Sequence, residues 1–182
     1  MKKITDKDFS EVIENEENSN IHFHGIDFSL YDFELKKFND CKFEKCNLSN
    51  IKIKNTTFNN VEFIKTKIMG INFGEINTLL SHFSFTNCNI YLSNFSGMSL
   101  KNISFEGSDI KETDFTKTNL ENSNLTFCDL EKSIFSETNL KNTDFRGAYN
   151  FAINPIINKL SKTKFSRDNS LLLLNYFDII VE

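Results

Sequence analysis

The sequence predicts a repeat protein built from short stacked units, and two observations lead to this fold class. An apolar residue falls at every fifth position through most of the chain, most regularly in FEGSDIKETDFTKTNLENSNLTFCDLEKSIFSETNLKNTDF, from Phe105 to Phe145. Residues 20 positions apart also tend to carry opposite charges. A period of five matches neither the 3.6 residues of a helical turn nor the simple alternation of a strand. Such a short fixed period indicates stacked units that share one continuous core.

The period-five pattern forms two blocks that differ in phase. The first block runs from Phe23 to Phe73 with eleven five-residue units, and the second from Phe85 to Phe145 with thirteen. All 24 central residues are Phe, Leu or Ile, and they include 14 of the 20 phenylalanines, so we expect them to fill the core. The core stack predicted for the most regular run includes Phe105, Phe115, Leu125, Phe135 and Phe145.

The two blocks are separated by a slip of two residues within 74–82. Two surplus residues predict a bulge or a small protruding loop, with Leu80 as a candidate extra core residue. An interruption of a regular repeat is either a functional feature or a tolerated insertion. The sequence leaves both interpretations open.

The position two residues before each centre is usually small. From Ile110 onward it is occupied by Ser108, Thr113, Thr118, Ser123, Cys128, Ser133, Thr138 and Thr143. The four cysteines, at positions 41, 46, 88 and 128, all occupy this slot, which favours inward packing over metal binding. There is no C-x-x-C motif and no Cys/His cluster, and the three histidines are scattered. We therefore predict no catalytic residue, no metal site, no cofactor and no small-molecule substrate.

A 20-residue coil would place residues that are one full repeat apart directly above one another. Opposite charges would then form ladders that fix the register, although each exposed pair adds little stability. Eight such pairs occur: Asp32/Lys52, Glu34/Lys54, Lys42/Glu62, Lys101/Glu121, Glu121/Lys141, Lys111/Glu131, Glu112/Lys132 and Lys117/Glu137. Only two like-charged pairs occur, Lys45/Lys65 and Asp109/Asp129, so the bias supports the 20-residue coil.

The units resemble the pentapeptide-repeat family, whose units follow the pattern A(D/N)LXX with a central Leu or Phe. Asp or Asn precedes the centre in five consecutive units, those of Ile110, Phe115, Leu120, Leu125 and Leu130. The resemblance covers residues 21–145, with the slip as the only break in phase. It implies an all-β fold, a right-handed quadrilateral β-helix in which four units of 20 residues in total make one coil. The 24 units then give about six coils, a rod roughly 29 Å long at ~4.8 Å per coil.

The segments outside the repeat are predicted to cap the two ends of the rod. Residues 1–20 form the N-terminal cap, with a short helix near residues 6–15. Residues 146–182 form the C-terminal cap, in which Ser166 begins a helix over 167–177 and a strand follows over 178–182. The chain is thus divided into 1–20, 21–145 and 146–182.

The C-terminal cap is more apolar than capping requires, which predicts a homodimer through residues 150–182. In this respect it resembles the gyrase-protecting members of the family, which are head-to-head dimers. The candidate interface residues are Leu171, Leu172, Leu174, Tyr176, Phe177 and Ile179.

The net charge of −4 does not suit a nucleic-acid binder, which would be basic. No apolar run is long enough to span a membrane, and the N-terminus lacks the apolar core of a signal peptide. We therefore expect a cytoplasmic protein that binds neither nucleic acid nor membrane.

The resemblance to the quinolone-resistance (Qnr-type) and mycobacterial gyrase-binding members implies a non-enzymatic mimic of DNA. Such a protein would bind a type II topoisomerase, DNA gyrase or topoisomerase IV, and give quinolone protection. Residues 81–145 hold nine acids and five bases, whereas residues 21–80 hold seven acids and eight bases. Five acids in the second block lack an opposite charge one coil away and form the candidate acidic strip, namely Glu106, Asp109, Asp114, Asp129 and Asp144.

Two other functions stay open from the sequence. One is a protein–protein interaction scaffold with a different partner. The other is immunity against a gyrase-directed peptide toxin. The larger loops of the Qnr-type proteins have no counterpart here except the slip at 74–82.

Overall fold

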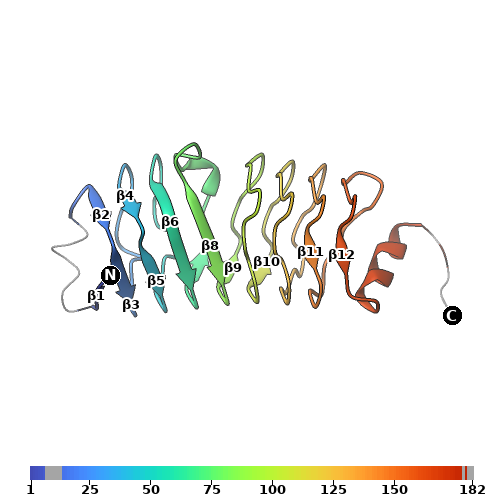
Figure 1. Ribbon diagram of the computed structural model, residues 1–182, viewed down its shortest axis with the longest axis horizontal. Helices are drawn as coiled ribbons and strands as arrows, with labels where there is room; N and C mark the ends of the chain where they lie inside the picture. Colours follow the sequence, from blue (N-terminus) through green and yellow to red (C-terminus); the bar gives the residue numbers. More distant parts are fainter. Residues whose placement is uncertain (7–13, 178, 180–182) are drawn as a thin grey trace.

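In the computed structural model the chain forms a rod of stacked coils, with β1 at one end and the helix η2 at the other (Figure 1). The structure describes residues 1–6, 14–177 and 179. Within this part the strands are β1 (Lys2–Ile4), β2 (Glu17–Ser19), β3 (Ile21–His24), β4 (Lys37–Asn39), β5 (Lys42–Glu44), β6 (Thr57–Ile64), β7 (Lys67–Met69), β8 (His82–Thr86), β9 (Asn89–Tyr91), β10 (Asp109–Lys111), β11 (Asp144–Phe145) and β12 (Lys164–Phe165). Two 3-10 helices are present, η1 (Phe73–Glu75) and η2 (Asn169–Tyr176).

The all-β solenoid has about eight turns, two more than the sequence analysis expected. Every strand pairing is parallel and joins one coil to the next. One side of the rod shows the repeat as a ladder of inward residues, Ile4, Phe23, Phe43, Phe63, Phe85, Phe105, Leu125, Phe145 and Phe165. The extra turns arise because β1 pairs with β3 and β12 with β11, so the coils extend beyond residues 21–145.

The corners of the coil are made by residues in the left-handed backbone conformation. They recur two residues after most centres, for example at Asn50 (φ 58°), Asn122 (φ 62°) and Lys132 (φ 58°). Asn and Gly adopt this conformation at low cost, and many of the corners carry them. The long strand β6 contains such a corner at Asn60 (φ 53°), and therefore pairs with both β4 and β5.

The core is a column of aromatic and aliphatic side chains. The predicted core stack is buried throughout: Phe105, Phe115, Leu125, Phe135 and Phe145 are each no more than 4% exposed. Phe115 stacks on Phe95 with ring centroids 5.3 Å apart and on Phe135 at 5.2 Å. Ring stacking between successive coils follows directly from the 20-residue repeat.

The small slots link the coils by hydrogen bonds. The side chain of Thr118 donates to the carbonyl of Phe95, 23 residues earlier, at 2.9 Å, and Thr143 donates in the same way to Leu120 at 2.7 Å. Each of these carbonyls also accepts a backbone N–H from its own coil, Met98 for Phe95 and Ser123 for Leu120, so the hydroxyl supplies a second hydrogen bond from the next coil. The thiol of Cys128 makes the equivalent contact with the carbonyl of Phe105 at 3.1 Å. The residues in this slot are small and face inward, as predicted, and they also form hydrogen bonds to the neighbouring coil.

The end elements differ from the expected ones. The helix near residues 6–15 falls mainly on residues 7–13, outside the described part of the chain, and so does the strand at 178–182 apart from Ile179. The C-terminal helix is the 3-10 helix η2. Ser166 does not cap it with its side chain, because the Ser166 hydroxyl accepts a hydrogen bond from the Gly147 N–H at 2.7 Å.

The slip forms a protrusion that begins with η1 (Figure 1). The Asn72 side chain accepts a hydrogen bond from the Gly74 N–H at 3.2 Å and caps η1. The expectation that Leu80 joins the core is wrong, because this side chain is 59% exposed. The ring of Phe83 packs against the core instead and stacks on Phe73 at 5.7 Å. The surplus residues lengthen this coil beyond the regular repeat, and the pairing of β6 with β8 therefore contains a register shift.

Candidate functional site

The candidate acidic strip lies on the second block, and most of its charge is neutralised. Asp109 and Asp129 are not isolated, because Lys111 bridges them, at 3.5 Å from Asp109 Oδ1 and 2.8 Å from Asp129 Oδ2. Burial raises the pKa of Asp129, but the hydrogen bonds from Lys111 and from the amide of Asn150 together lower it by more than burial raises it. The pKa of Asp129 is therefore below its ordinary value. The like-charged pair found in the sequence is thus held together by a shared cation.

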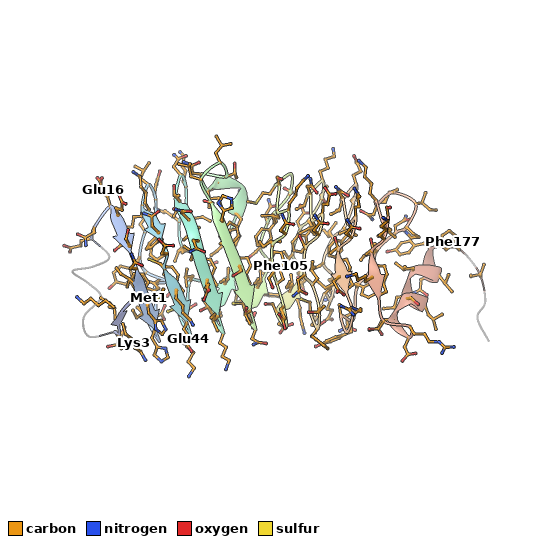
Figure 2. The ribbon with its side chains drawn as sticks, in the orientation of Figure 1. Met1, Lys3, Glu16, Glu44, Phe105 and Phe177 are labelled. Atoms are coloured by element: carbon orange, nitrogen blue, oxygen red, sulfur yellow. The ribbon has the colours of Figure 1, made fainter. Side chains whose placement is uncertain are left out.

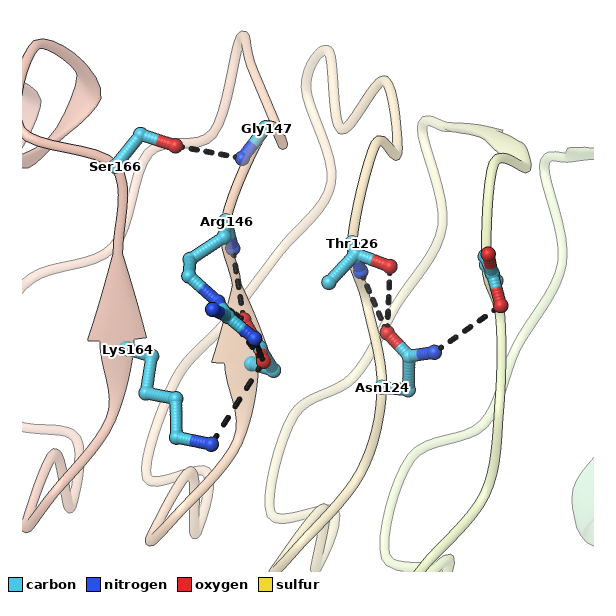
Figure 3. A network of polar contacts seen from close by, with 8 residues as sticks. Asn124, Thr126, Arg146, Gly147, Lys164 and Ser166 are labelled. Atoms are coloured by element: carbon cyan, nitrogen blue, oxygen red, sulfur yellow. Dashed lines mark hydrogen bonds and ion pairs between the residues drawn. The ribbon is translucent and has the colours of Figure 1, made fainter.

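Asp144 is also paired, which the sequence analysis missed because it ended the repeat at Phe145. Arg146 Nη2 lies 2.6 Å from Asp144 Oδ2, and Lys164 Nζ lies 3.8 Å from the same oxygen (Figure 3). The hydrogen bond from Arg146 lowers the pKa of Asp144. Lys164 lies one coil beyond Asp144 in the register of β11 with β12, so an extended repeat would have revealed this partner.

Two of the five acids carry no ion pair within the described part of the chain. Glu106 accepts a hydrogen bond from Asn124 at 3.4 Å, and Asn124 in turn accepts from the N–H and hydroxyl of Thr126 (Figure 3). Asp114 accepts only a local bond from the Thr116 N–H, at 2.8 Å. The available negative charge of the strip is therefore centred on Glu106 and Asp114.

The charge ladders are largely confirmed. Six of the eight opposite pairs found in the sequence form ion pairs, and Glu121 lies between two lysines, 3.0 Å from Lys101 and 3.1 Å from Lys141. Asn142 also donates to Asn122 at 2.9 Å, as the amide ladder requires. These contacts fix the register of the coils and leave little of the second block's charge for a partner.

The slip presents the most distinctive surface of the rod. Leu79 in this segment is 89% exposed, and it lines two hollows. The hollow toward the C-terminus has a volume of about 520 Å³ and is lined in part by His82, Lys101 and Asn102. The hollow toward the N-terminus has a volume of about 300 Å³ and is lined in part by Lys37. An exposed apolar side chain beside two open hollows of mixed polar and apolar lining suits a protein contact better than a small-molecule site.

The predicted dimer residues lie on and after η2 at the C-terminal end of the rod (Figure 2 labels Phe177). Leu172 packs partly against the core, whereas Leu171, Tyr176, Phe177 and Ile179 are exposed. Leu174 is half-buried. An apolar surface of this kind is available for a second copy, and the interface stays a prediction.

The structure brings together two histidines that the sequence analysis treated as scattered. His22 and His24 lie on β3. One ring nitrogen of each, Nε2 of His22 and Nδ1 of His24, approaches the same carboxylate oxygen of Glu44 on β5. Burial raises the pKa of Glu44, but the hydrogen bonds to His22 and His24 together lower it by more than burial raises it. The pKa of Glu44 is therefore below its ordinary value. The signal in the sequence was H-x-H around a core Phe, with an acid one coil after the second histidine.

The cysteines have the buried, unreactive character expected of the small slot. All four are free and buried. Burial raises the pKa of Cys46 and Cys88 to about 11 and that of Cys128 to about 12, so these groups remain thiols at neutral pH. The sequence prediction of a packing role is supported.

A family model described as "pentapeptide repeat region" matches residues 36–115 and 84–169. The chain belongs to the pentapeptide-repeat family. This match reaches further toward the C-terminus than the repeat found in the sequence analysis, in agreement with the extra turns. No curated protein sequence matches the chain. Within the described residues, no helix has the length and apolar character needed to cross a membrane.

Among solved structures, this pentapeptide-repeat protein is similar to QnrB1, described as a plasmid-mediated fluoroquinolone resistance protein. Full-length QnrB1 aligns with a TM-score of 0.62 and 18% identity, over 98% of this chain and 95% of QnrB1. A trypsin-treated QnrB1 variant aligns with a TM-score of 0.66 and 18% identity, over 91% of this chain and 90% of that one. At this identity the similarity shows a shared solenoid fold.

Proposed function

We propose that this protein acts without catalysis, by binding a type II topoisomerase, DNA gyrase or topoisomerase IV, and protecting it from quinolones in the cytoplasm. The observation that carries the proposal is the fold match to QnrB1 over 98% of the chain. A solenoid offers a long fixed surface and supports function through contacts along that surface. QnrB1 is named as a fluoroquinolone resistance protein, and a rod of nearly the same extent suits the same task.

DNA mimicry accounts for only part of the proposed binding. Residues 81–145 have a net charge of −4, which would favour a basic DNA-binding groove. However, ion pairs engage Asp109, Asp129 and Asp144, and residues 146–168 hold five bases and one acid. We therefore assign electrostatic steering to Glu106 and Asp114, and the specific contact to Leu79 and the hollows beside it.

The test is a supercoiling assay with purified DNA gyrase, with and without a quinolone. Increasing amounts of the protein are expected to restore supercoiling in the presence of the drug, or to inhibit the enzyme directly in its absence. Bovine serum albumin at equal concentration is the control for nonspecific effects. No change at a large molar excess, with topoisomerase IV tested in parallel, would contradict the proposal.

We also propose that the active form is a homodimer joined through residues 150–182. The exposed Leu171, Tyr176 and Phe177 support this, because large apolar side chains exposed at one end of the rod favour burial against a partner. Light scattering at micromolar concentration is expected to give twice the chain mass of 21.1 kDa. Leu171→Ser with Phe177→Ser should shift the mass toward that of one chain, and a wild-type monomer would contradict the dimer.

A second candidate is an interaction scaffold for an unrelated protein, and the neutralised acidic strip favours it. A surface whose charges are mostly paired internally resembles DNA less closely than an unpaired one. In that case the slip would still be the contact, and both topoisomerase assays would show no effect.

A further inference from the structure

Outside the slip and the acidic strip, the first coils carry a compact group of metal-ligand atoms. His22 and His24 flank Phe23, which is fully buried, so the alternation of the strand places both imidazoles on the outer face. The parallel register of β3 and β5 pairs His24 directly with Glu44. Glu44 and Lys3 appear near the N-terminal end of the rod in Figure 2.

The distances within this group are short. His22 Nε2 lies 2.8 Å and His24 Nδ1 lies 3.3 Å from the same Glu44 oxygen, and the two rings meet edge to face with centroids 5.6 Å apart. The three ligand atoms all lie within 4.8 Å of one another. The side chains are 21%, 27% and 25% exposed, so an ion can enter from solvent while the backbone holds the ligands on two hydrogen-bonded strands.

We propose that His22, His24 and Glu44 form a binding site for a divalent transition metal of the zinc class. Two imidazoles and one carboxylate are ligands that zinc prefers, whereas magnesium and calcium favour all-oxygen sites. Zinc–ligand bonds of ~2.0–2.1 Å in a tetrahedral site separate the ligand atoms by roughly 3.3–3.4 Å. The present separations require only small side-chain rotations to reach that spacing, and water supplies the fourth ligand.

The surrounding charges allow the ion but do not favour other cations. Lys3 and Lys42 occupy the positions in register with His22 on the neighbouring strands, so the local field is not strongly negative. A weakly coordinating cation would gain little here, whereas zinc gains from direct bonds to imidazole nitrogen. The ion would cross-link β3 and β5, and therefore stabilise the folded state by an amount that grows logarithmically with the concentration of free zinc above its dissociation constant.

The test is titration of the full chain, freed of metal with a chelator, with zinc chloride in isothermal titration calorimetry. One ion per chain is expected to bind, and the melting temperature is expected to rise with zinc concentration. His24→Asn and Glu44→Gln should each weaken zinc binding by at least roughly tenfold. The matched control His82→Asn removes a histidine elsewhere and should bind as the wild type does. Circular dichroism without metal verifies that every variant is folded.

Cobalt(II) provides a second measurement at the same site. Its visible absorption is expected to have the intensity of a tetrahedral complex in the wild type and in His82→Asn, and to be lost in His24→Asn. Absence of saturable zinc binding in the folded wild type would overturn the proposal. Equal binding by the wild type, His24→Asn and Glu44→Gln would place the ion elsewhere and overturn it too.

Discussion

The two repeat blocks on either side of the slip build the same coil from different contacts. In the first block eight of the eleven centres are Phe, and the small slot is often apolar, as at Ile26, Ile51, Val61 and Ile71. In the second block the slots from 108 to 143 are all Ser, Thr or Cys. The difference teaches that the five-residue period fixes the geometry, whereas the links between coils can be aromatic packing or hydrogen bonds.

The two blocks also differ in the side-chain contacts that link successive coils on the surface. Lys/Glu ladders dominate the second block, with Glu121 between Lys101 and Lys141 as the clearest case. In the first block Asp32 and Lys52 form a ladder ion pair at 3.7 Å, and amide side chains also link successive coils, as Asn47 does to Asp27 and Asn60 to Asp40. The second block is thus linked by charge ladders and slot hydrogen bonds, whereas the first block combines stacked Phe rings with a smaller number of slot hydrogen bonds, such as that from Thr66 to the Phe43 carbonyl.

The largest expected effect tests whether the two blocks share one core. Phe115→Ala should lower the free energy of unfolding by about 3–5 kcal/mol, because its ring stacks between two others. Phe43→Ala, between Phe23 and Phe63, should cost a similar amount. Urea denaturation measures both, with the exposed Phe127→Ala as the control. A cost for Phe115→Ala no larger than that for Phe127→Ala would contradict a shared stacked core.

The hydrogen-bonded slots of the second block should give the next largest effect. Thr118→Val keeps the shape but removes one of the two donors to the Phe95 carbonyl, which still accepts from the Met98 N–H, and should cost about 0.5–1.5 kcal/mol. The matched change in the first block is Ile71→Val, which removes one methylene and no hydrogen bond, at a cost of about 0.5–1.5 kcal/mol. A Thr118→Val cost near zero in thermal or urea unfolding would show that the slot bonds do not hold the coils together.

The corners should respond alike in the two blocks. Leu35 (φ 64°) in the first block and Leu92 (φ 52°) in the second occupy left-handed corners and are exposed. Because Asn tolerates this conformation better, Leu35→Asn and Leu92→Asn should each raise the free energy of unfolding, by up to about 1 kcal/mol. Differential scanning calorimetry compares the melting temperatures. Stabilisation of one variant and destabilisation of the other would mean that the corners differ between the blocks.

The smallest expected effect concerns the ladders. Hydrogen bonds from Lys101 and Lys141 lower the pKa of Glu121 below its ordinary value of 4.5. The ion pairs therefore stabilise the fold above the ordinary pKa, and this stabilisation is lost as the pH falls through the lowered pKa of the folded state.

The variant Glu121→Gln should remove that part of the pH dependence. Its loss of stability at neutral pH should be small and should shrink as salt is added. The control is Glu34→Gln in the first block, where the described residues show no ion pair to Glu34. Urea unfolding at pH 3.5–7 and at two salt concentrations makes the comparison. Identical pH profiles for the wild type and Glu121→Gln would show that the ion pairs of Glu121 do not contribute to the stability of the fold.

Much of this fold could be predicted because its period is written directly in the sequence. The core residues follow from the five-residue spacing, the 20-residue coil follows from the resemblance to the pentapeptide-repeat family, and most ladder pairs follow from the two together. The coil count fell short because Ile4 and Phe165 continue the core where the intervening residues no longer keep the five-residue phase. Leu80 was misplaced because Phe83, in a slot meant for a small residue, fills the space beneath the slip.

The candidate site was harder to predict, because ion pairs depend on side chains that reach along a coil as well as across coils. Lys111 forms ion pairs with Asp109, Asp129 and Glu131. A comparison of equivalent positions in successive coils finds only the pair with Glu131. The histidine group was missed for the opposite reason. Its members follow the coil register, with His24 paired to Glu44 one coil later, but no Cys/His motif along the chain marks them.

The central claim is that this rod binds a topoisomerase through the slip. The most direct test measures how tightly the rod binds to immobilised DNA gyrase. The wild type should bind saturably, and Leu79→Ser with Leu80→Ser should lose most of that binding while melting at the same temperature. Leu30→Ser is the matched control, because Leu30 is 95% exposed at another place on the rod. Wild-type binding that the slip variant retains in full would contradict the assigned contact, and no binding by the wild type would contradict the claim itself.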